Sequence, residues 1–339
     1  MKIEAGLRIG SYTLQEKLGF GTTGIVHKAW HETLGRPVAI KFLPPMHDPL
    51  ARERFIREGK AMRLLDHPNI VEVLDAGEVA GTPFMVFDYV AGGTLAERIE
   101  KARLTDGEGM LILDNVARAL DYAHRQGILH RDIKPANILL TETTMPVIAD
   151  FGLARLLDQP AVTGAGLLSG TPAYMSPEQA NGGVLTAAAD QYSLAVTAYE
   201  LLTGQLPFPG ETVSEVVVAL LTREPDRPST HRPDLGPRVD AAILRGLHKS
   251  AGKRWPSCRA FTDALLAALA SRAIAPVAPT AVAPAATAPI ATSLDSTTPT
   301  PIDLDSSSLM TIAVERDELE QRPRRSWLTS LIGSLAPTS

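Results

Sequence analysis

One eight-residue segment limits what this chain can fold into more than any other feature. The segment, HRDIKPAN at His130–Asn137, follows a helical pattern and precedes the apolar residues 138–140. Thirteen residues after Asn137, Asp150 follows the strand-like run MPVIA. Asp150 and Asn137 carry oxygen ligands of the kind that Mg²⁺ prefers, and Asp132 is then free to orient a hydroxyl group and accept its proton. Turn capping explains each residue singly, but not the ordered set.

A glycine motif lies near the start of the chain, in the run LGFGTTGIV. Gly19, Gly21 and Gly24 lack side chains, so backbone N–H groups there can approach phosphate oxygens. The same spacing opens dinucleotide-binding folds, in which the glycines lead from a strand into a helix. Here Ile25 and Val26 continue an apolar alternation, which favours glycines at the tip of a hairpin.

A lysine and a glutamate follow the glycines in the order that phosphate chemistry requires. Lys41 ends the strand-like run VAIK, and Glu58 lies on the helical pattern that comes next. A glutamate in that place can pair with the lysine ammonium group and hold it towards phosphates. Taken alone, both residues are better explained as solvated surface charges.

Two kinds of secondary-structure pattern follow one another in the chain up to residue 270. The first 90 residues carry alternating β-branched runs, such as 37–42 and 82–90, with one helical pattern at 50–65. Residues 95–270 are mainly helical in pattern. The patterns therefore predict an α+β fold, with a small β-rich lobe followed by a larger, mainly helical lobe.

Two helical patterns in the larger lobe carry clear stop signals. These patterns cover residues 110–126 and 187–202, and Gly127 and Gly204 stand where a helix end favours a left-handed residue. We therefore expect both helices to end there.

Composition excludes several classes of function. The net charge of −5 offers no global positive field, so nucleic acid is not expected as a partner. The single cysteine, Cys258, rules out an intramolecular disulfide and a Cys-rich zinc site, and the eight histidines form no ligand cluster along the sequence. A structural metal is therefore not expected.

Charges within residues 1–10 interrupt the apolar run of an export signal, which favours a cytoplasmic protein.

The last part of the chain reads as a tether and a tail. Residues 271–308 are rich in Ala, Pro, Thr and Ser, which is typical of a disordered linker, and four prolines argue against a membrane span at 273–294. Within the tail, 309–339, three arginines precede apolar residues at helical spacing. We expect a frayed tail or a docking peptide, or alternatively a short amphipathic helix over 322–335 that contacts the inner face of the membrane.

At this point the sequence resembles the eukaryotic-type protein kinases, and more narrowly the bacterial serine/threonine kinases of that superfamily. The resemblance covers residues 10–270, with the motifs in the family's order. It implies a bilobal kinase fold, with an N-lobe at 10–89 and a C-lobe at 90–270. It also implies a signalling enzyme that transfers the γ-phosphoryl group of ATP, with Mg²⁺, to Ser or Thr hydroxyls of protein substrates.

The resemblance assigns roles to four catalytic residues. Lys41 would contact the α and β phosphates, and Glu58 would pair with it. Asp132 would be the catalytic base. Lys134, two residues later, matches the serine/threonine pattern and would help to neutralise the transferring phosphoryl group.

The resemblance also implies the sites of metal, nucleotide and substrate binding. Asn137 and Asp150 would hold Mg²⁺, and Thr171 would belong to the substrate-docking loop. Phe87 would be the gatekeeper beside the adenine-binding hinge at 88–90. The nucleotide-binding positions implied are Leu18, Gly19, Gly21, Gly24, Val26, Ala39, Lys41, Phe87, Asp88, Tyr89, Val90 and Leu139.

Regulation is expected in the segment between Asp150 and Glu178. In this family an arginine such as Arg131 commonly receives a phosphate from that segment, and a guanidinium group binds phosphate bidentately. Thr163 and Ser169 are the candidate phosphorylation sites, with Thr163 the first choice. A homodimer would allow autophosphorylation in trans.

Further matches are structural. Glu178 resembles a buried glutamate that pairs with an arginine near the domain end, for which Arg254 is the candidate. Asp190 resembles the aspartate that holds the catalytic-loop backbone. Three departures are the SPE at 176–178, where the family usually has APE, Ala195, where it has glycine, and Gly59. Gly59 costs about 1 kcal/mol inside a helix and suggests a loosely held helix.

Two other functions compete with this interpretation. A pseudokinase scaffold would bind partners without turnover, although every catalytic side chain is present. A small-molecule kinase of the aminoglycoside or choline type is the second alternative, and Lys134, Thr171 and the SPE segment at 176–178 disfavour it.

Overall fold

The computed structural model describes residues 2–21, 24–44, 48–151 and 172–272. The predictions for Thr163, Ser169 and Thr171 fall outside these ranges, as do those for the tail and for nearly all of the linker. Of the expected linker, the first two residues belong to the last helix, which runs to Arg272. The backbone of Glu58 is described, but its side chain is not.

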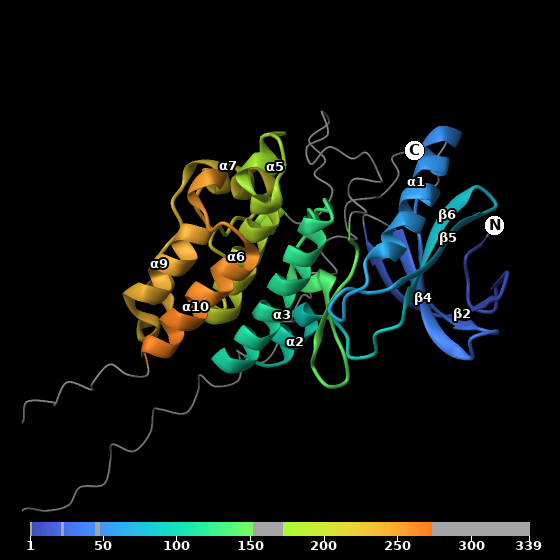
Figure 1. Cartoon of the computed structure of the whole chain (residues 1–339), viewed down its shortest axis with the longest axis horizontal. Coiled ribbons are helices and arrows are strands. Elements are labelled where there is room, and N and C mark those ends of the chain that lie inside the picture. Colours follow the sequence, from blue (N-terminus) through green and yellow to red (C-terminus); the bar gives the residue numbers. More distant parts are fainter. Residues whose placement is uncertain (1, 22–23, 45–47, 152–171, 273–339) are drawn as a thin grey trace, which may run out of the picture. The chain divides into compact units, whose positions relative to one another are not determined.

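The β-rich lobe is built on one antiparallel sheet of six strands (Figure 1). The strands occur in the spatial order β1-β2-β3-β4-β6-β5. Their bounds are Arg8–Ile9 (β1), Tyr12–Gly21 (β2), Gly24–His31 (β3), Arg36–Phe42 (β4), Val73–Val79 (β5) and Thr82–Asp88 (β6). The sequence prediction of a β-rich first part is therefore confirmed.

Each face of this sheet carries its own hydrophobic cluster, because successive side chains of a strand point to opposite faces. One cluster includes Ile40, Phe42 and Val86. The other includes Met85 and Phe87, and it packs against Phe55 of helix α1 (Pro49–Ala61). The strand register pairs Lys41 with Met85, so Lys41 belongs to the second face, which α1 covers.

Helix α1 is shorter than the pattern predicted. The expected helix ran from residue 50 to 65, whereas the α-helix ends at Ala61 and a 3₁₀ turn, Met62–Leu64, follows. Leu65 then leaves the helix and packs into the core of the helical lobe, while Phe55 stays with the sheet. Burying these two side chains in different cores therefore ends the helix early.

Close packing explains the glycine at position 59, although glycine has a low helix propensity. A Cβ atom at this position would lie 3.2 Å from the Cβ of Ala76 and 3.4 Å from the Cε of Met85. The glycine thus lets α1 approach strands β5 and β6 closely.

The second lobe is mainly helical, with one small hairpin (Figure 1). That hairpin pairs β7 (Ile138–Leu140) with β8 (Pro146–Ile148). The α-helices are α2 (Leu95–Lys101), α3 (Asp106–Arg125), α5 (Pro177–Ala180), α6 (Ala187–Thr203), α7 (Val213–Thr222), α8 (Pro228–His231), α9 (Gly236–Gly246) and α10 (Cys258–Arg272). The 3₁₀ turns here are Pro135–Asn137, Pro172–Tyr174, Pro233–Leu235 and Ala251–Lys253.

Helix α3 starts four residues earlier than expected, at Asp106 rather than at residue 110. The reason is a capping box in the preceding turn. The Thr105 hydroxyl accepts a hydrogen bond from Glu108 N at 3.2 Å, and the Glu108 carboxylate accepts one from Thr105 N at 2.8 Å. At the other end of α3, Gly127 is left-handed with φ 73°, and so is Gly204 after α6 with φ 75°. Both predicted helix ends are confirmed.

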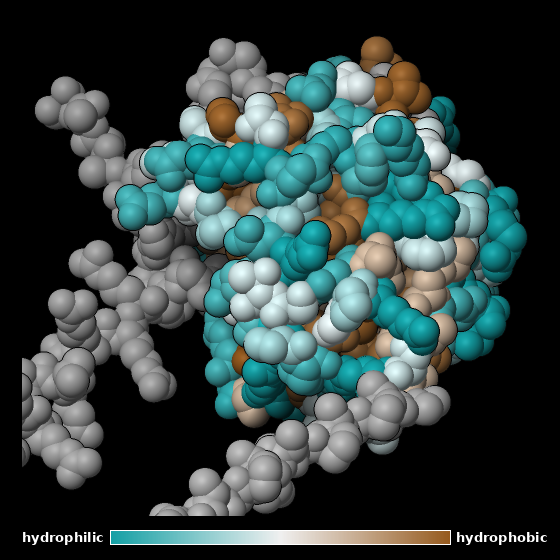
Figure 2. All heavy atoms as spheres, turned by 90° about the vertical axis from the view of Figure 1, so that its left-hand side faces the viewer, coloured by the Kyte–Doolittle hydropathy of each residue, from teal (hydrophilic) through white to brown (hydrophobic). Residues whose placement is uncertain are grey.

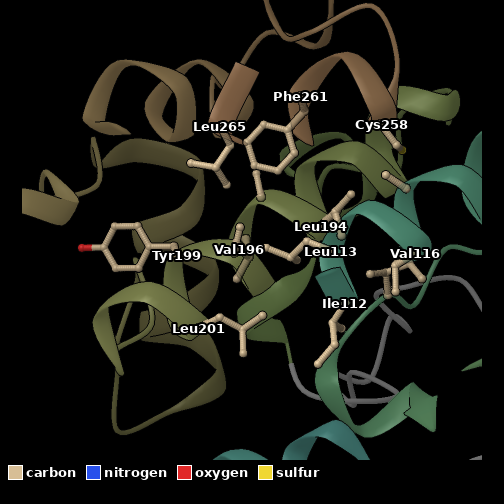
Figure 3. Close-up of a cluster of buried hydrophobic side chains, with 14 of the residues drawn as sticks. Ile112, Leu113, Val116, Leu194, Val196, Tyr199, Leu201, Cys258, Phe261 and Leu265 are labelled. Carbon is tan, nitrogen blue, oxygen red and sulfur yellow. The ribbon is translucent and has the colours of Figure 1, made fainter. Parts of the chain in front are cut away.

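The core of the helical lobe lies where α3, α6 and α10 meet. Phe261 and Leu265 of α10 lie near Val196 of α6, and Leu113 of α3 lies beside Leu194 (Figure 3). Where α9 packs against α6, a Cβ at Gly246 would lie 2.8 Å from the Cβ of Ala195. The family resemblance places a glycine at position 195. In this chain position 195 is alanine, and the glycine at the close approach of the two helices is Gly246 of α9.

The surface of the helical lobe is mixed in character. On the face shown in Figure 2, hydrophobic residues form small areas separated by hydrophilic ones. Among the described residues, no helix is both long enough and apolar enough to cross a membrane.

Candidate active site

The sheet register brings the glycine motif and Lys41 into one row. Gly19 pairs with Val26, and Val26 pairs with Lys41 on the next strand. Directly opposed residues of antiparallel strands present their side chains on the same face. Val26 and Lys41 therefore share the face of the sheet that α1 covers.

The hairpin predicted from the glycine motif is confirmed. Gly21 pairs with Gly24, which joins β2 to β3 in antiparallel order. Gly24 has φ 135°, a conformation that side chains disfavour. A Cβ atom there would also overlap the carbonyl oxygen of Phe42 on β4. Gly19, by contrast, has open space where a Cβ would stand.

Several of the predicted nucleotide-binding residues meet on the Lys41 face. Ala39 lies directly opposite Phe87 in the β4–β6 register. Phe87 is buried in the hydrophobic cluster of this face, and Ala39 and Val90 pack against that cluster. Leu18 is exposed on β2, and Leu139 lies on β7 of the other lobe.

Lys41 reaches across to the second lobe. Its Nζ lies 2.6 Å from Oδ2 of Asp150, and the lysine side chain is only 5% exposed. The sequence predicted an ion pair with Glu58 instead. Since the side chain of Glu58 is not among those described, that pair stays a prediction.

The segment His130–Asn137 forms a compact loop around Asp132. Lys134 Nζ contacts both carboxylate oxygens of Asp132, at 3.0 and 2.8 Å. The amide nitrogen of Asn137 donates to the Asp132 backbone oxygen at 2.7 Å and to its carboxylate at 2.9 Å. The amide oxygen of Asn137 takes no part in these bonds, which leaves the atom suited to a metal ligand for that role.

Asp190, in the first turn of α6, holds this loop through hydrogen bonds to its backbone. Its carboxylate accepts hydrogen bonds from the backbone nitrogens of His130 at 2.8 Å and Arg131 at 2.7 Å. His124 Nε2 lies 2.7 Å from the same carboxylate. Burial opposes the charge of Asp190, but the hydrogen bonds from the His124 side chain and the His130 backbone outweigh it and lower the pKa of Asp190. The predicted contact between Asp190 and the loop backbone is confirmed.

The Arg131 backbone needs this support, because its φ of 72° lies in the left-handed region. Such a conformation costs about 1–3 kcal/mol and persists only where the surroundings impose it. Arg131 O also accepts a hydrogen bond from Gln179 Nε2 at 2.7 Å. The strain thus lies directly beside Asp132.

Asp150 stands at the end of β8 and is also left-handed, with φ 63°. Ala149 N donates to Asn137 O at 2.9 Å, which joins the turn before Asp150 to the loop that carries Asp132. His130 Nε2 lies 2.8 Å from Ala149 O, and its ring packs edge-on against Phe151. These contacts place the carboxylates of Asp132 and Asp150 on adjoining segments.

Glu178 and Arg254 form the predicted pair. The two carboxylate oxygens accept from the two terminal nitrogens of Arg254, at 2.7 and 2.8 Å. Three backbone oxygens, of residues 188, 248 and 249, take its other N–H groups. The guanidinium group is completely buried, so this prediction from the sequence is confirmed.

A cleft of about 900 Å³ lies beside the hinge segment. Residues 88–91, the β7–β8 turn at 141–143 and the segment 65–72 contribute to its walls. Neither Lys41 nor Asp150 lines this cleft. It is therefore separate from the charged cluster, which consists of Lys41, Asp132, Lys134, Asn137 and Asp150.

Sequence reasoning missed His124. Its partner Asp190 is 66 residues away, and a histidine inside an amphipathic helix gives no signal of its own. The contact follows only from the crossing of α3 and α6.

Comparison with known proteins accounts for this arrangement. Residues 12–264 match the family model of the protein kinase domain. The serine/threonine-protein kinase Pkn1 of Myxococcus xanthus is 38% identical over 273 residues, which cover 78% of this chain and 39% of Pkn1. PknB of Mycolicibacterium smegmatis is 38% identical over 257 residues, which cover 72% of this chain and 40% of PknB. The chain thus spans about two fifths of the length of these two relatives.

Solved structures agree. The crystal structure of the PknI kinase domain of Mycobacterium tuberculosis is 34% identical to this chain and matches it with a TM-score of 0.64. The match covers 79% of this chain and 100% of that one. With the charged cluster and the two lobes in place, these comparisons show that the chain belongs to the protein kinase family.

Proposed function

We propose that this protein is a serine/threonine protein kinase, which transfers the γ-phosphoryl group of ATP to Ser or Thr hydroxyls of other proteins. The observation that carries the proposal is the Lys41–Asp150 contact next to the loop of Asp132, Lys134 and Asn137. This cluster joins two lysine cations, two carboxylates and an amide oxygen where the two lobes meet.

The chemistry of these groups fits a nucleotide with its magnesium ion. Asn137 and Asp150 would hold Mg²⁺ through oxygen atoms, and Lys41 would bind phosphate oxygens. Mg²⁺, when bound, neutralises negative charge on the phosphate oxygens. Gly24 lets the hairpin backbone pass close to β4, and β3, which begins at Gly24, pairs with the strand that carries Lys41.

Asp132 has the position of a general base. Its carboxylate is held by Lys134 and by Asn137, so its direction is fixed before a substrate arrives. It would orient the substrate hydroxyl group and accept its proton as the oxygen attacks phosphorus. Lys134, 2.8 Å from the Asp132 carboxylate, would stabilise the negative charge of the transferring group.

Radiolabelled ATP and a generic protein substrate test this proposal. We expect transfer of label by the full chain, and loss of at least about 100-fold in Asp132→Asn and Asp150→Asn, since each removes a group needed in the transition state. Equal labelling by wild type and Asp150→Asn would favour a scaffold without turnover. Labelling of aminoglycosides or choline, and not of protein, would favour a small-molecule kinase.

We also propose that the enzyme phosphorylates itself on Thr163 or Ser169. The support comes from the sequence and from the position of Arg131, which directly precedes Asp132. Mass spectrometry should find phosphate on these residues in the wild type but not in Asp132→Asn. If Thr163→Ala and Ser169→Ala together leave activity and phosphate content unchanged, this regulatory proposal is wrong.

Two proposals concern partners. Autophosphorylation in trans between two copies predicts that the rate per enzyme molecule rises with protein concentration at a constant, saturating concentration of ATP. Membrane contact through residues 322–335 predicts that the chain floats with anionic liposomes and that a chain without residues 309–339 does not.

Comparing phosphoproteins of cells with wild type and with Asp132→Asn would identify the substrates of the signalling role.

A further inference from the structure

Three side chains of different chemistry meet where α3 passes the start of α10. Asp121 and His124 lie on the last turns of α3, and Cys258 is the first residue of α10. A carboxylate oxygen, an imidazole nitrogen and the thiol sulfur lie within 4.8 Å of one another. Figure 3 shows Cys258 among the buried residues near α3.

His124 presents an unpartnered nitrogen to this group. Its Nε2 is held by the Asp190 carboxylate, which can only accept, so Nε2 carries the proton and Nδ1 keeps its lone pair. Within the described part of the chain, Nδ1 makes no hydrogen bond and lies 3.9 Å from Asp121 Oδ1. The imidazole is only 9% exposed. This nitrogen is therefore able to accept a hydrogen bond or to bind a metal ion.

The other two side chains are also held in place. The Asp121 carboxylate accepts from the backbone nitrogens of Cys258 at 3.0 Å and Arg259 at 3.1 Å, so it caps α10. The Cys258 thiol is also hydrogen-bonded to this carboxylate. These three bonds fix the carboxylate and still leave lone pairs on its oxygens. Cys258 is completely buried, whereas Asp121 and His124 keep some contact with solvent, which gives a route of entry.

We propose that Asp121, His124 and Cys258 bind a divalent metal ion of the zinc type. Sulfur, imidazole nitrogen and carboxylate oxygen together are the ligands of Zn²⁺, whereas Mg²⁺ takes oxygen ligands. Zinc bonds of about 2.0–2.3 Å place tetrahedral ligand atoms about 3.5 Å apart. The three atoms therefore need to close by about an ångström around the ion. The thiol proton passes to solvent as the thiolate forms, and water or the second Asp121 oxygen completes the site.

The contact to Asp190 is what a zinc ligand normally has behind it. A metal-bound histidine usually donates its other N–H to a carboxylate, which fixes the ring and its tautomer. Here that carboxylate also holds the backbone of His130 and Arg131. A bound ion would thus join α3 to α10 and strengthen, through Asp190, the support of the catalytic loop.

The sequence indicated no such cluster. His124 and Asp121 are three residues apart, but Cys258 lies 134 residues beyond His124, which matches no metal-ligand spacing. Only the packing of α10 against α3 brings the thiol to the other two groups.

Cobalt gives a sharp test because Cys258 is the only cysteine in the chain. The full chain, freed of metal by a chelator and kept without ATP, is titrated with Co²⁺. We expect one equivalent to bind with a thiolate-to-cobalt charge-transfer band and the visible bands of a tetrahedral ion, and Zn²⁺ should abolish both. Cobalt bound at Asn137 and Asp150 has no sulfur ligand and cannot produce the charge-transfer band.

Variants separate a built site from a reactive thiol. Cys258→Ala should lose the band, and Asp121→Asn should weaken cobalt binding at least about tenfold. Asp263→Asn, which changes an exposed acid of the same helix, should bind cobalt as the wild type does. Zinc at a hundredfold excess over its dissociation constant should raise the thermal midpoint of the wild type by about 5–10 °C, and that of Cys258→Ala not at all.

Circular dichroism establishes that each variant is folded before cobalt is added. Absence of the charge-transfer band in the folded wild type would overturn the proposal. So would a band of unchanged affinity in both Asp121→Asn and His124→Gln, since the sulfur would then bind cobalt without its two neighbours.

Discussion

Lys41 Nζ and Asp150 Oδ2 lie 2.6 Å apart although 109 residues separate them in the sequence. The lysine is the last residue but one of β4, a central strand of the sheet, and the aspartate follows the small hairpin of the helical lobe. The contact therefore ties the two lobes together where the phosphates of ATP are proposed to bind. It also gives Lys41, buried on the α1 face, a partner of opposite charge.

The first prediction concerns this lysine. Lys41→Met should lower kcat/KM for protein phosphorylation by about 100-fold or more, because a positive charge directed at the phosphates is lost. Steady-state kinetics with labelled ATP measure the effect. Lys101→Met, an exposed lysine at the end of α2, is the control and should leave kcat/KM unchanged. Equal losses in the two variants would contradict a specific role for Lys41.

The second prediction distinguishes two glycines of one motif. Gly24→Ala should lower the free energy of unfolding by about 1–3 kcal/mol, because its φ of 135° disfavours a side chain and its Cβ would overlap Phe42 O. Gly19→Ala has open space at the Cβ position and should change stability little. Urea unfolding followed by circular dichroism gives both values. A larger loss in Gly19→Ala would show that the hairpin differs from the one described.

Local patterns predicted most of the elements near the site, because each depends on neighbouring residues. The glycine hairpin, the strand that ends at Lys41 and the left-handed Gly127 all follow from short-range rules. The capping box Thr105–Glu108 is an equally local signal, and it places the start of α3 earlier than the apolar pattern does. The early end of α1 could not be predicted, since it depends on Leu65 joining a different core.

Long-range polar contacts were predictable only through the family resemblance. Glu178 and Arg254 are 76 residues apart, and no periodicity links them. The contact between Lys41 and Asp150 is of the same kind, and the sequence offered Glu58 as the partner instead. Charge alone does not select among 38 acidic residues. Only the fold decides which of them a buried cation meets.

The third prediction concerns the buried Arg254. Arg254→Ala should lower the free energy of unfolding by about 3–5 kcal/mol, because it leaves Glu178 without a partner in a buried site. Arg254→Lys should not restore stability, since an ammonium group cannot replace five N–H donors in a fixed plane. Denaturant titration measures each loss.

Arg259→Ala is the matched control for Arg254. Arg259 lies on the neighbouring helix and contacts Asp263 at 3.8 Å, with both side chains exposed. Its removal should change stability by no more than about 0.5 kcal/mol. If Arg254→Ala cost no more than this control, the pair with Glu178 would be a minor contributor to stability.

The last prediction concerns Glu200, which accepts a hydrogen bond from the Tyr174 hydroxyl at 2.6 Å. Burial raises the pKa of Glu200, and the bond from Tyr174 offsets only part of this rise. The folded protein therefore holds the Glu200 proton to a higher pH than the unfolded chain does. Between the unfolded pKa of about 4.5 and the raised folded pKa, the folded state binds more protons, so stability falls as pH rises.

Glu200→Gln removes this titration and keeps an oxygen that accepts from Tyr174. The difference in unfolding free energy, wild type minus variant, should therefore be most favourable to the wild type near pH 4.5 and decline as pH rises through the folded pKa of Glu200. Denaturant midpoints from pH 4.5 to 8 measure this difference, with the exposed Glu142→Gln as control. A difference that stayed constant over this range, or that grew with pH, would show that Glu200 is ionised in the folded protein throughout, with Tyr174 and its surroundings stabilising the charge.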